Sequence, residues 1–179
     1  MTEAEKIVAV FGSSDGVEGE EAYETARAAG KMLAELGYVV ATGGYGGMME
    51  AASRGAKEGG GATIGVLCSI WKSAPNPWVD RVVQTHDLRQ RMETLVDLGT
   101  CGYVVMVGAN GTLSELAHVW ERKTLRQMHD RPLVFVGRFW QPLIDLMGKA
   151  RASSQAHVTV VDSPRELPVA FPPIRAGLQ

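Results

Sequence analysis

The sequence predicts a doubly wound α/β fold, in which a mainly parallel sheet of about six or seven strands carries helices on both faces. Two observations lead to this prediction. Short apolar runs alternate along the whole chain with segments whose apolar residues recur at helical spacing. In addition, three of the apolar runs are followed directly by glycine-containing turns, which is typical of the connection from a strand of a parallel sheet to the next helix.

The first part of the chain has the order strand, helix, strand, helix, strand. Apolar residues at helical spacing over 22–36 indicate the first helix, and Gly37 is suited to end it. A second helix over 49–56 ends at the glycines 59–61. Successive parallel strands need right-handed crossovers, so this part predicts βαβ units. The expected strands cover 6–11, 38–42 and 63–67.

The second part begins with an irregular loop over 69–77 and continues the alternation. Asp87 is placed to cap a helix that carries Leu88, Met92 and Leu95. The proline-containing tail from about residue 163 is expected to be irregular, and residues 1–179 are expected to form a single nucleotide-binding domain. The expected strands cover 81–85, 102–107, 132–136 and 157–161, with further helices up to about Gln127 and over 140–147.

Charge and composition exclude several classes of protein. The formal net charge is −2 and the acidic and basic residues are interspersed, which argues against nucleic-acid and membrane partners. The polar start is unlike a signal peptide, and no apolar run reaches transmembrane length. Cys68 and Cys101 lie in apolar surroundings and are expected to be buried free thiols. Together these features predict a cytoplasmic protein.

The glycine-containing turns predict a binding site for an anion. In doubly wound sheets, ligands bind beyond the carboxyl ends of the strands, so the three turns should meet there. Glycine lets backbone N–H groups approach an oxyanion, and a helix N-terminus adds partial positive charge. We expect a nucleotide phosphate in this crevice, with Glu115 near the sugar. The predicted ligand-binding residues are Gly12, Ser13, Ser14, Gly43, Gly44, Gly46, Gly47, Gly108, Asn110, Gly111 and Thr112.

Each candidate residue also has a purely structural interpretation. Thr112 and Glu115 match a capping box, and the glycines of 43–47 also suit a tightly packed turn. Arg91 is either a fixed guanidinium that pairs with phosphate or Glu115, or a solvated helix charge. Glu50 suits the start of a helix because a carboxylate complements the helix dipole.

Other motifs narrow the chemistry. Neither G-x-G-x-x-G at the first turn nor G-x-x-x-x-G-K-[ST] occurs, which disfavours hydride transfer and P-loop hydrolysis. The four histidines show no metal-ligand spacing, so we expect no metal. Trp71 and Trp78 border the irregular loop and either stack on a base or serve ordinary packing.

Residues 42–52, Arg91 and residues 108–115 resemble the Lonely Guy family, long labelled possible lysine decarboxylases. That family belongs to a Rossmann-like superfamily that includes molybdenum cofactor carrier proteins, and the resemblance runs from about Val8 to Met147. It implies a homodimer or larger assembly, without cofactor, that cleaves the N-glycosidic bond of nucleoside 5′-monophosphates to give free base and ribose 5-phosphate. By the same match, Gly111 and Thr112 hold the phosphate, and Glu115 and Arg91 are catalytic.

The signature of the family is Pro-Gly-Gly-x-Gly-Thr-x-x-Glu, and the chain departs from the family pattern at three places. Val107 stands in place of proline, Ala109 in place of the second glycine, and Met92 follows the arginine. An alanine needs more room than glycine and resists positive φ, so hydrolysis is affected more than binding.

The alternative function is that of a non-catalytic carrier or sensor for a nucleotide or a pterin cofactor such as the molybdenum cofactor. A DNA-processing relative is a third possibility, which the near-neutral charge disfavours. No lysine has a setting that suits a cofactor aldimine.

Under the hydrolytic interpretation the two polar side chains have distinct roles. Glu115 stabilises an oxocarbenium-like sugar and orients a water molecule, acting as a general base. Arg91 neutralises charge and positions Glu115.

Overall fold

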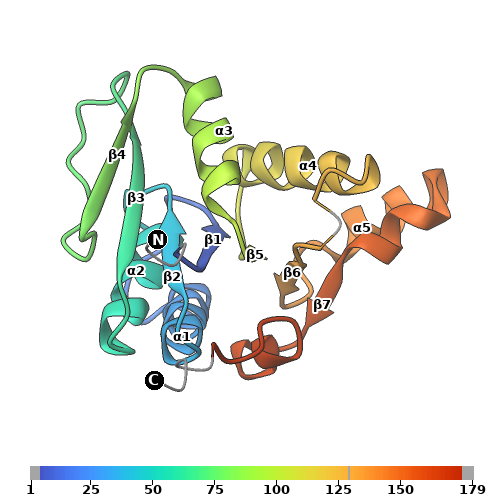
Figure 1. The fold of residues 1–179 in the computed structure, drawn as a ribbon, viewed down its shortest axis with the longest axis horizontal. Helices are drawn as coiled ribbons and strands as arrows, with labels where there is room; N and C mark the ends of the chain where they lie inside the picture. Colours follow the sequence, from blue (N-terminus) through green and yellow to red (C-terminus); the bar gives the residue numbers. More distant parts are fainter. Residues whose placement is uncertain (1–4, 129, 175–179) are drawn as a thin grey trace.

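A computed structural model describes residues 5–128 and 130–174. It contains a seven-stranded sheet in the order β4-β3-β2-β1-β5-β6-β7, in which every neighbouring pair is parallel (Figure 1). This confirms the predicted doubly wound α/β fold. The strands are β1 (Ile7–Phe11), β2 (Val39–Thr42), β3 (Thr63–Cys68), β4 (Arg81–Thr85), β5 (Gly102–Val105), β6 (Leu133–Val136) and β7 (Thr159–Val161).

Helices cover both faces of the sheet, because its central strands are apolar on both sides. In β1, Val8 and Val10 belong to one core cluster, whereas Ile7 and Phe11 belong to the other. The first cluster packs against α1 (Glu21–Glu35) and α2 (Met48–Glu58). The second packs against α3 (Leu88–Leu98), α4 (Asn110–Thr124) and α5 (Gln141–Ala150).

The strand order changes direction at β1. From β1 the chain proceeds outward through β2 and β3 to β4, then returns to the opposite side of β1 and continues through β5 to β7. Ala9 of β1 is accordingly paired with Ala41 of β2 and with Tyr103 of β5. The carboxyl ends of β1 and β5 therefore flank the switch point where such folds bind ligands.

A loop rather than a helix connects β3 to the edge strand β4. The buried side chain of Asn76 fastens this loop, donating through Nδ2 to the carbonyl oxygens of Gly44 (3.2 Å) and Tyr45 (2.9 Å). The Asn76 N–H also donates to Gly44 O at 2.9 Å. The loop is thus held against the glycine turn that follows β2.

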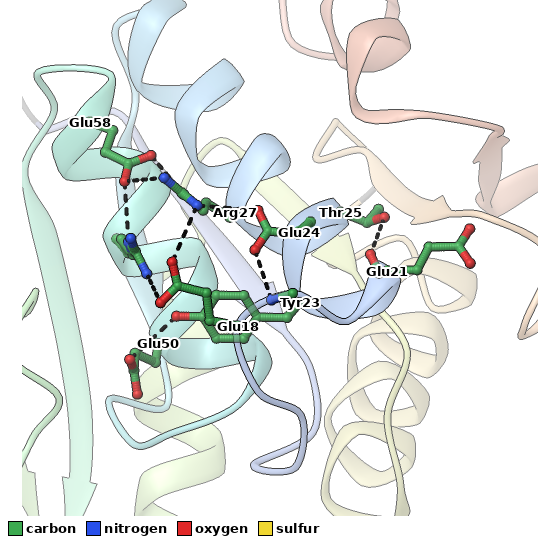
Figure 2. A network of polar contacts seen from close by, with 10 residues as sticks. Glu18, Glu21, Tyr23, Glu24, Thr25, Arg27, Glu50 and Glu58 are labelled. Atoms are coloured by element: carbon green, nitrogen blue, oxygen red, sulfur yellow. Dashed lines mark hydrogen bonds and ion pairs between the residues drawn. The ribbon is translucent and has the colours of Figure 1, made fainter.

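Several ion pairs and hydrogen bonds hold α1 against α2 (Figure 2). Arg27 contacts Glu58 at 2.8 Å, and the Tyr23 hydroxyl donates to Glu50 at 3.3 Å. Arg54 contacts Glu18 at 2.8 Å. Glu50 lies in the first turn of α2, as its structural interpretation requires.

The structure confirms several of the features predicted from local sequence signals. Asp87 caps α3, its Oδ1 accepting from the Gln90 N–H at 2.8 Å. Gly37 comes directly after Leu36, the C-cap residue of α1, and has a φ of +93°. Cys68 is a buried free thiol and Cys101 a half-buried one. Leu88, expected on the apolar stripe of α3, is instead 53% exposed.

The C-terminal region differs from the expectation in two respects. The segment predicted as a strand from His157 is shorter, because η1 (Ala152–His157), a 3-10 helix, precedes β7. The tail from about 163 is not irregular throughout, since η2 (Pro164–Val169) is a further 3-10 helix with a capping box. Leu167 and Phe171 are buried in the cluster beneath α1, so apolar burial orders this tail despite its prolines. In the described part of the chain, no helix is long and apolar enough to span a membrane.

Candidate functional site

A cavity of about 450 Å³ lies at the switch point. The turns after β1 and β2, the start of α4, the β3–β4 loop and α3 all contribute to its wall. Arg91 and Glu115 line it together with six of the predicted ligand-binding residues, namely Gly12, Ser13, Ser14, Gly46, Gly111 and Thr112. The other five predicted residues, Gly43, Gly44, Gly47, Gly108 and Asn110, are not among the lining residues.

The glycines of the turn after β2 approach protein atoms closely. A Cβ at position 43 would collide with the Arg91 guanidinium. Gly44 (φ +78°) would meet Leu67, and Gly47 (φ +64°) would meet the backbone of the turn after β1. Packing therefore accounts for these three glycines, as the structural interpretation holds. Their ligand contacts stay predictions, as do those of Gly108 and Asn110.

Arg91 is held in one orientation by two backbone carbonyls. Its Nε donates to Val66 O at 2.9 Å and its Nη2 to Gly43 O at 3.0 Å. Its Nη1 lies 3.6 Å from Glu115 Oε1, and its side chain is only 12% exposed. The guanidinium is therefore a fixed charge in the cavity wall rather than a solvated helix charge.

Glu115 does not cap its helix. The helix α4 begins at Asn110, its N-cap is Ala109, and no side-chain cap hydrogen bond is formed. The capping-box interpretation is therefore wrong, because Glu115 lies in the second turn. Burial raises the pKa of Glu115 to about 7, and the nearby Arg91 opposes this shift by lowering it.

Thr112, which also lines the cavity, carries a buried polar atom. The residue is 2% exposed, and its Oγ1 has no hydrogen-bond partner among the described residues. Buried hydroxyl groups are normally paired, so an unpaired one in a cavity wall suggests a bond to a ligand. A Cβ at Gly108 would collide with the Thr112 side chain, which explains why position 108 is glycine.

Ala109 fits its position without strain. Its φ is −114° and its ψ −151°, which is extended backbone. The expectation that an alanine here resists the required conformation is therefore wrong, because the position does not use positive φ. Substitution of the signature glycine leaves the backbone at the start of α4 intact.

Sequence reasoning missed part of the cavity wall. Asp15, Tyr45, Met49, Ser73 and Ala74 also line it. Tyr45 could have been found, because an aromatic residue inside a glycine run has no local structural reason. Within the described residues, no group of three or more His, Cys, Asp or Glu side chains is arranged to hold a metal ion.

These features define the class as a doubly wound α/β protein with a small-molecule cavity at the topological switch point. The profile of the SLOG cluster4 family matches residues 5–167, and the chain belongs to that family. The resemblance to the Rossmann-like Lonely Guy group is thereby confirmed.

Two relatives and one solved structure illustrate the similarity. An uncharacterized protein of Archaeoglobus fulgidus is 34% identical over 98 residues, which is 55% of this chain and 64% of that protein. The chain thus matches less than two thirds of this relative's length. The cytokinin riboside 5′-monophosphate phosphoribohydrolase of Mycobacterium marinum is 28% identical over 154 residues, 80% of this chain and 81% of that enzyme. The molybdenum cofactor binding protein of the phototrophic bacterium Rippkaea orientalis is 26% identical, with a TM-score of 0.74 over 92% of this chain and 93% of that one.

Proposed function

We propose that this protein is a nucleoside 5′-monophosphate phosphoribohydrolase, which converts its substrate to free base and ribose 5-phosphate. The observation that carries the proposal is the buried pair of Arg91 and Glu115, which lines the same cavity as the unpaired hydroxyl of Thr112. The similarity to the Mycobacterium marinum phosphoribohydrolase supports it.

The phosphate binds at the start of α4. Thr112 Oγ1 donates to a phosphate oxygen, and the helix N-terminus adds partial positive charge there. At Gly111, an added Cβ would meet no atom within 4 Å, so a ligand has open access to the backbone. Glu115 lies one helical turn farther along α4 and faces the sugar.

Glu115 activates the attacking water. With a pKa of about 7, much of the carboxyl is ionised at neutral pH and accepts the proton that water loses. The water oxygen bonds to the anomeric carbon, and the electron pair of the broken C–N bond leaves with the base, which takes a proton from solvent. The carboxylate also stabilises the oxocarbenium-like sugar, and general-base help of this kind is worth roughly 10²–10⁴-fold.

Turnover of nucleotides tests the proposal. The protein is incubated with AMP and other nucleoside monophosphates, and free base and ribose 5-phosphate are measured by chromatography. Release of both products in equal amounts is expected, and adenosine, which lacks the phosphate, should react poorly. Absence of base release from every monophosphate would overturn the hydrolase assignment.

A carrier function is the second candidate, favoured by the similarity to the Rippkaea orientalis molybdenum cofactor binding protein. Such a protein would bind a nucleotide or a phosphorylated pterin in the same cavity without converting it. Tight binding with no product, or pterin fluorescence that copurifies with the protein, would favour this function. The family resemblance also implies a homodimer or larger homo-oligomer, which light scattering after size-exclusion chromatography tests.

A further inference from the structure

One part of the cavity wall is aromatic. Tyr45, from the turn after β2, and Trp71, from the β3–β4 loop, line the cavity with ring centroids 5.5 Å apart and planes at 85°. The Arg91 Cζ lies 5.5 Å from each ring centroid, which is cation–π distance. The guanidinium thus joins the aromatic wall to Glu115.

Hydrogen bonds to Cys68 hold the Tyr45 hydroxyl and the backbone of Trp71 in place. The Tyr45 hydroxyl accepts from the Cys68 N–H at 2.9 Å, and the Trp71 N–H donates to Cys68 O at 3.1 Å. Asn76 ties the rest of the loop to the turn that carries Tyr45. A preformed wall lowers the ordering cost of binding.

Trp71 nevertheless leaves much of its indole uncovered. It is 43% exposed, the largest value among the tryptophans of the chain. Trp120 and Trp140 donate through Nε1 to the carbonyls of Ser154 and Met106, whereas Trp78 packs over the Arg54 guanidinium. A flat ligand in the cavity would cover this exposed apolar surface, which is favourable.

The side chains follow one another in a defined order along the cavity wall. The aromatic rings contact Arg91, Arg91 contacts Glu115, and Glu115 lies one turn from Thr112. A ligand with its phosphate at Thr112 and its sugar beside Glu115 therefore directs its base toward Trp71.

We propose that Trp71, supported by Tyr45, is the platform on which a planar heteroaromatic base stacks, and that it selects nucleotides over sugar phosphates. This inference rests on the proposed phosphate position at Thr112. It assigns to Trp71 a role in specificity rather than in bond cleavage.

Tryptophan fluorescence and calorimetry test this platform in a Glu115→Gln background, which prevents turnover. AMP should quench the fluorescence and ribose 5-phosphate should not, and Trp71→Phe should abolish the quenching. Because stacking on an aromatic side chain contributes substantially to binding, Trp71→Ala should weaken AMP binding by about 5- to 100-fold. The affinity for ribose 5-phosphate should stay within about twofold, since that ligand has no base to stack.

Trp78→Phe is the matched control, because Trp78 lies on the same connection but is not among the cavity-lining residues. Quenching by AMP should persist in that variant. AMP binding that is unchanged in Trp71→Ala, or quenching that survives in Trp71→Phe, would overturn the platform and leave the proposed function standing. Failure of both AMP and ribose 5-phosphate to bind would overturn the proposed function and the platform together.

Discussion

The Nη1 atom of Arg91 lies 3.6 Å from Oε1 of Glu115, in a cavity wall where the two side chains are 12% and 10% exposed. This separation is too long for a hydrogen bond, so the arginine only partly offsets the cost of burying the carboxylate. Two other N–H groups of the Arg91 guanidinium donate to the backbone carbonyls of Val66 and Gly43. The carboxyl is therefore poised between its charged and neutral forms near neutral pH.

Replacement of Glu115 by Gln should separate catalysis from binding. The amide keeps the size of the side chain but cannot accept a proton from water, so base release should fall by at least about 10²-fold. Affinity for AMP, measured by calorimetry, should change little because the phosphate is bound elsewhere. Unchanged turnover in this variant would end the catalytic assignment of Glu115.

The raised pKa of Glu115 should also appear in the pH dependence of stability. Between about pH 4.5 and 7 the folded protein binds more protons at this site than the unfolded chain, so the free energy of unfolding falls as the pH rises. Because of this pKa shift, the free energy of unfolding should be roughly 3 kcal/mol lower above pH 7 than below pH 4.5. When the free energy of unfolding is measured by urea unfolding across this pH range, it should fall more steeply with rising pH in wild type than in Glu115→Gln. Parallel curves would contradict the raised pKa.

Loss of the Arg91 charge should move the pH profile of the reaction. Arg91 lowers the pKa of Glu115, so Arg91→Gln should raise that pKa further above its ordinary value. The limb of the rate profile that reports ionised Glu115 should then shift to higher pH, in addition to a lower maximal rate. A lower rate with an unshifted limb would show that Arg91 acts on the substrate alone.

Thr112→Val should weaken phosphate binding without cost to the fold. The change removes a buried hydroxyl that has no partner among the described residues, so stability should stay equal or rise. A lost hydrogen bond to a charged group is worth about 1.5–3 kcal/mol, which is roughly 10- to 100-fold in affinity for AMP. Ser114→Ala is the control on the same helix, because Ser114 Oγ donates to Asn110 O instead. Equal losses of affinity in both variants would argue against the phosphate position.

Two glycine substitutions should have opposite effects on stability. Gly43→Ala places a methyl group against the Arg91 guanidinium and should cost about 1–3 kcal/mol. Gly111→Ala meets no atom within 4 Å in the second position of α4 and should stabilise by about 0.4–1 kcal/mol, while narrowing the cavity. Thermal unfolding distinguishes them, and a stable Gly43→Ala variant would show that Arg91 can relocate.

Much of the fold follows from local patterns. The short runs that form β1 and β4, the helix end at Gly37 and the helix start at Asp87 are short-range signals, so the sequence contains them directly. The meeting of the turns after β1, β2 and β5 at one edge of the sheet follows from the topology of parallel sheets rather than from any one residue. The C-terminal 3-10 helices were missed because burial of Leu167 against α1 is a tertiary interaction that overrides the prolines.

The candidate site was only partly accessible from sequence. Glu115 and Arg91 were both predicted as site residues, and pairing with Glu115 was one of the roles considered for Arg91. Four glycines predicted to contact the ligand, Gly43, Gly44, Gly47 and Gly108, instead lie close to protein atoms and do not line the cavity. Sequence cannot distinguish these cases, since both need a missing Cβ. The contribution of the β3–β4 loop depends on how an irregular segment folds back, which has no periodic signature.

The absence of a helix between β3 and β4 has an evolutionary consequence. Trp71 belongs to a connection outside the repeating strand–helix scaffold, whereas Glu115 and Arg91 are anchored in regular helices. Mutations that change the sequence of this connection do not alter the residues of the two hydrophobic core clusters. Descendants of one ancestor could therefore diversify in the molecules they recognise while inheriting the same reactive pair.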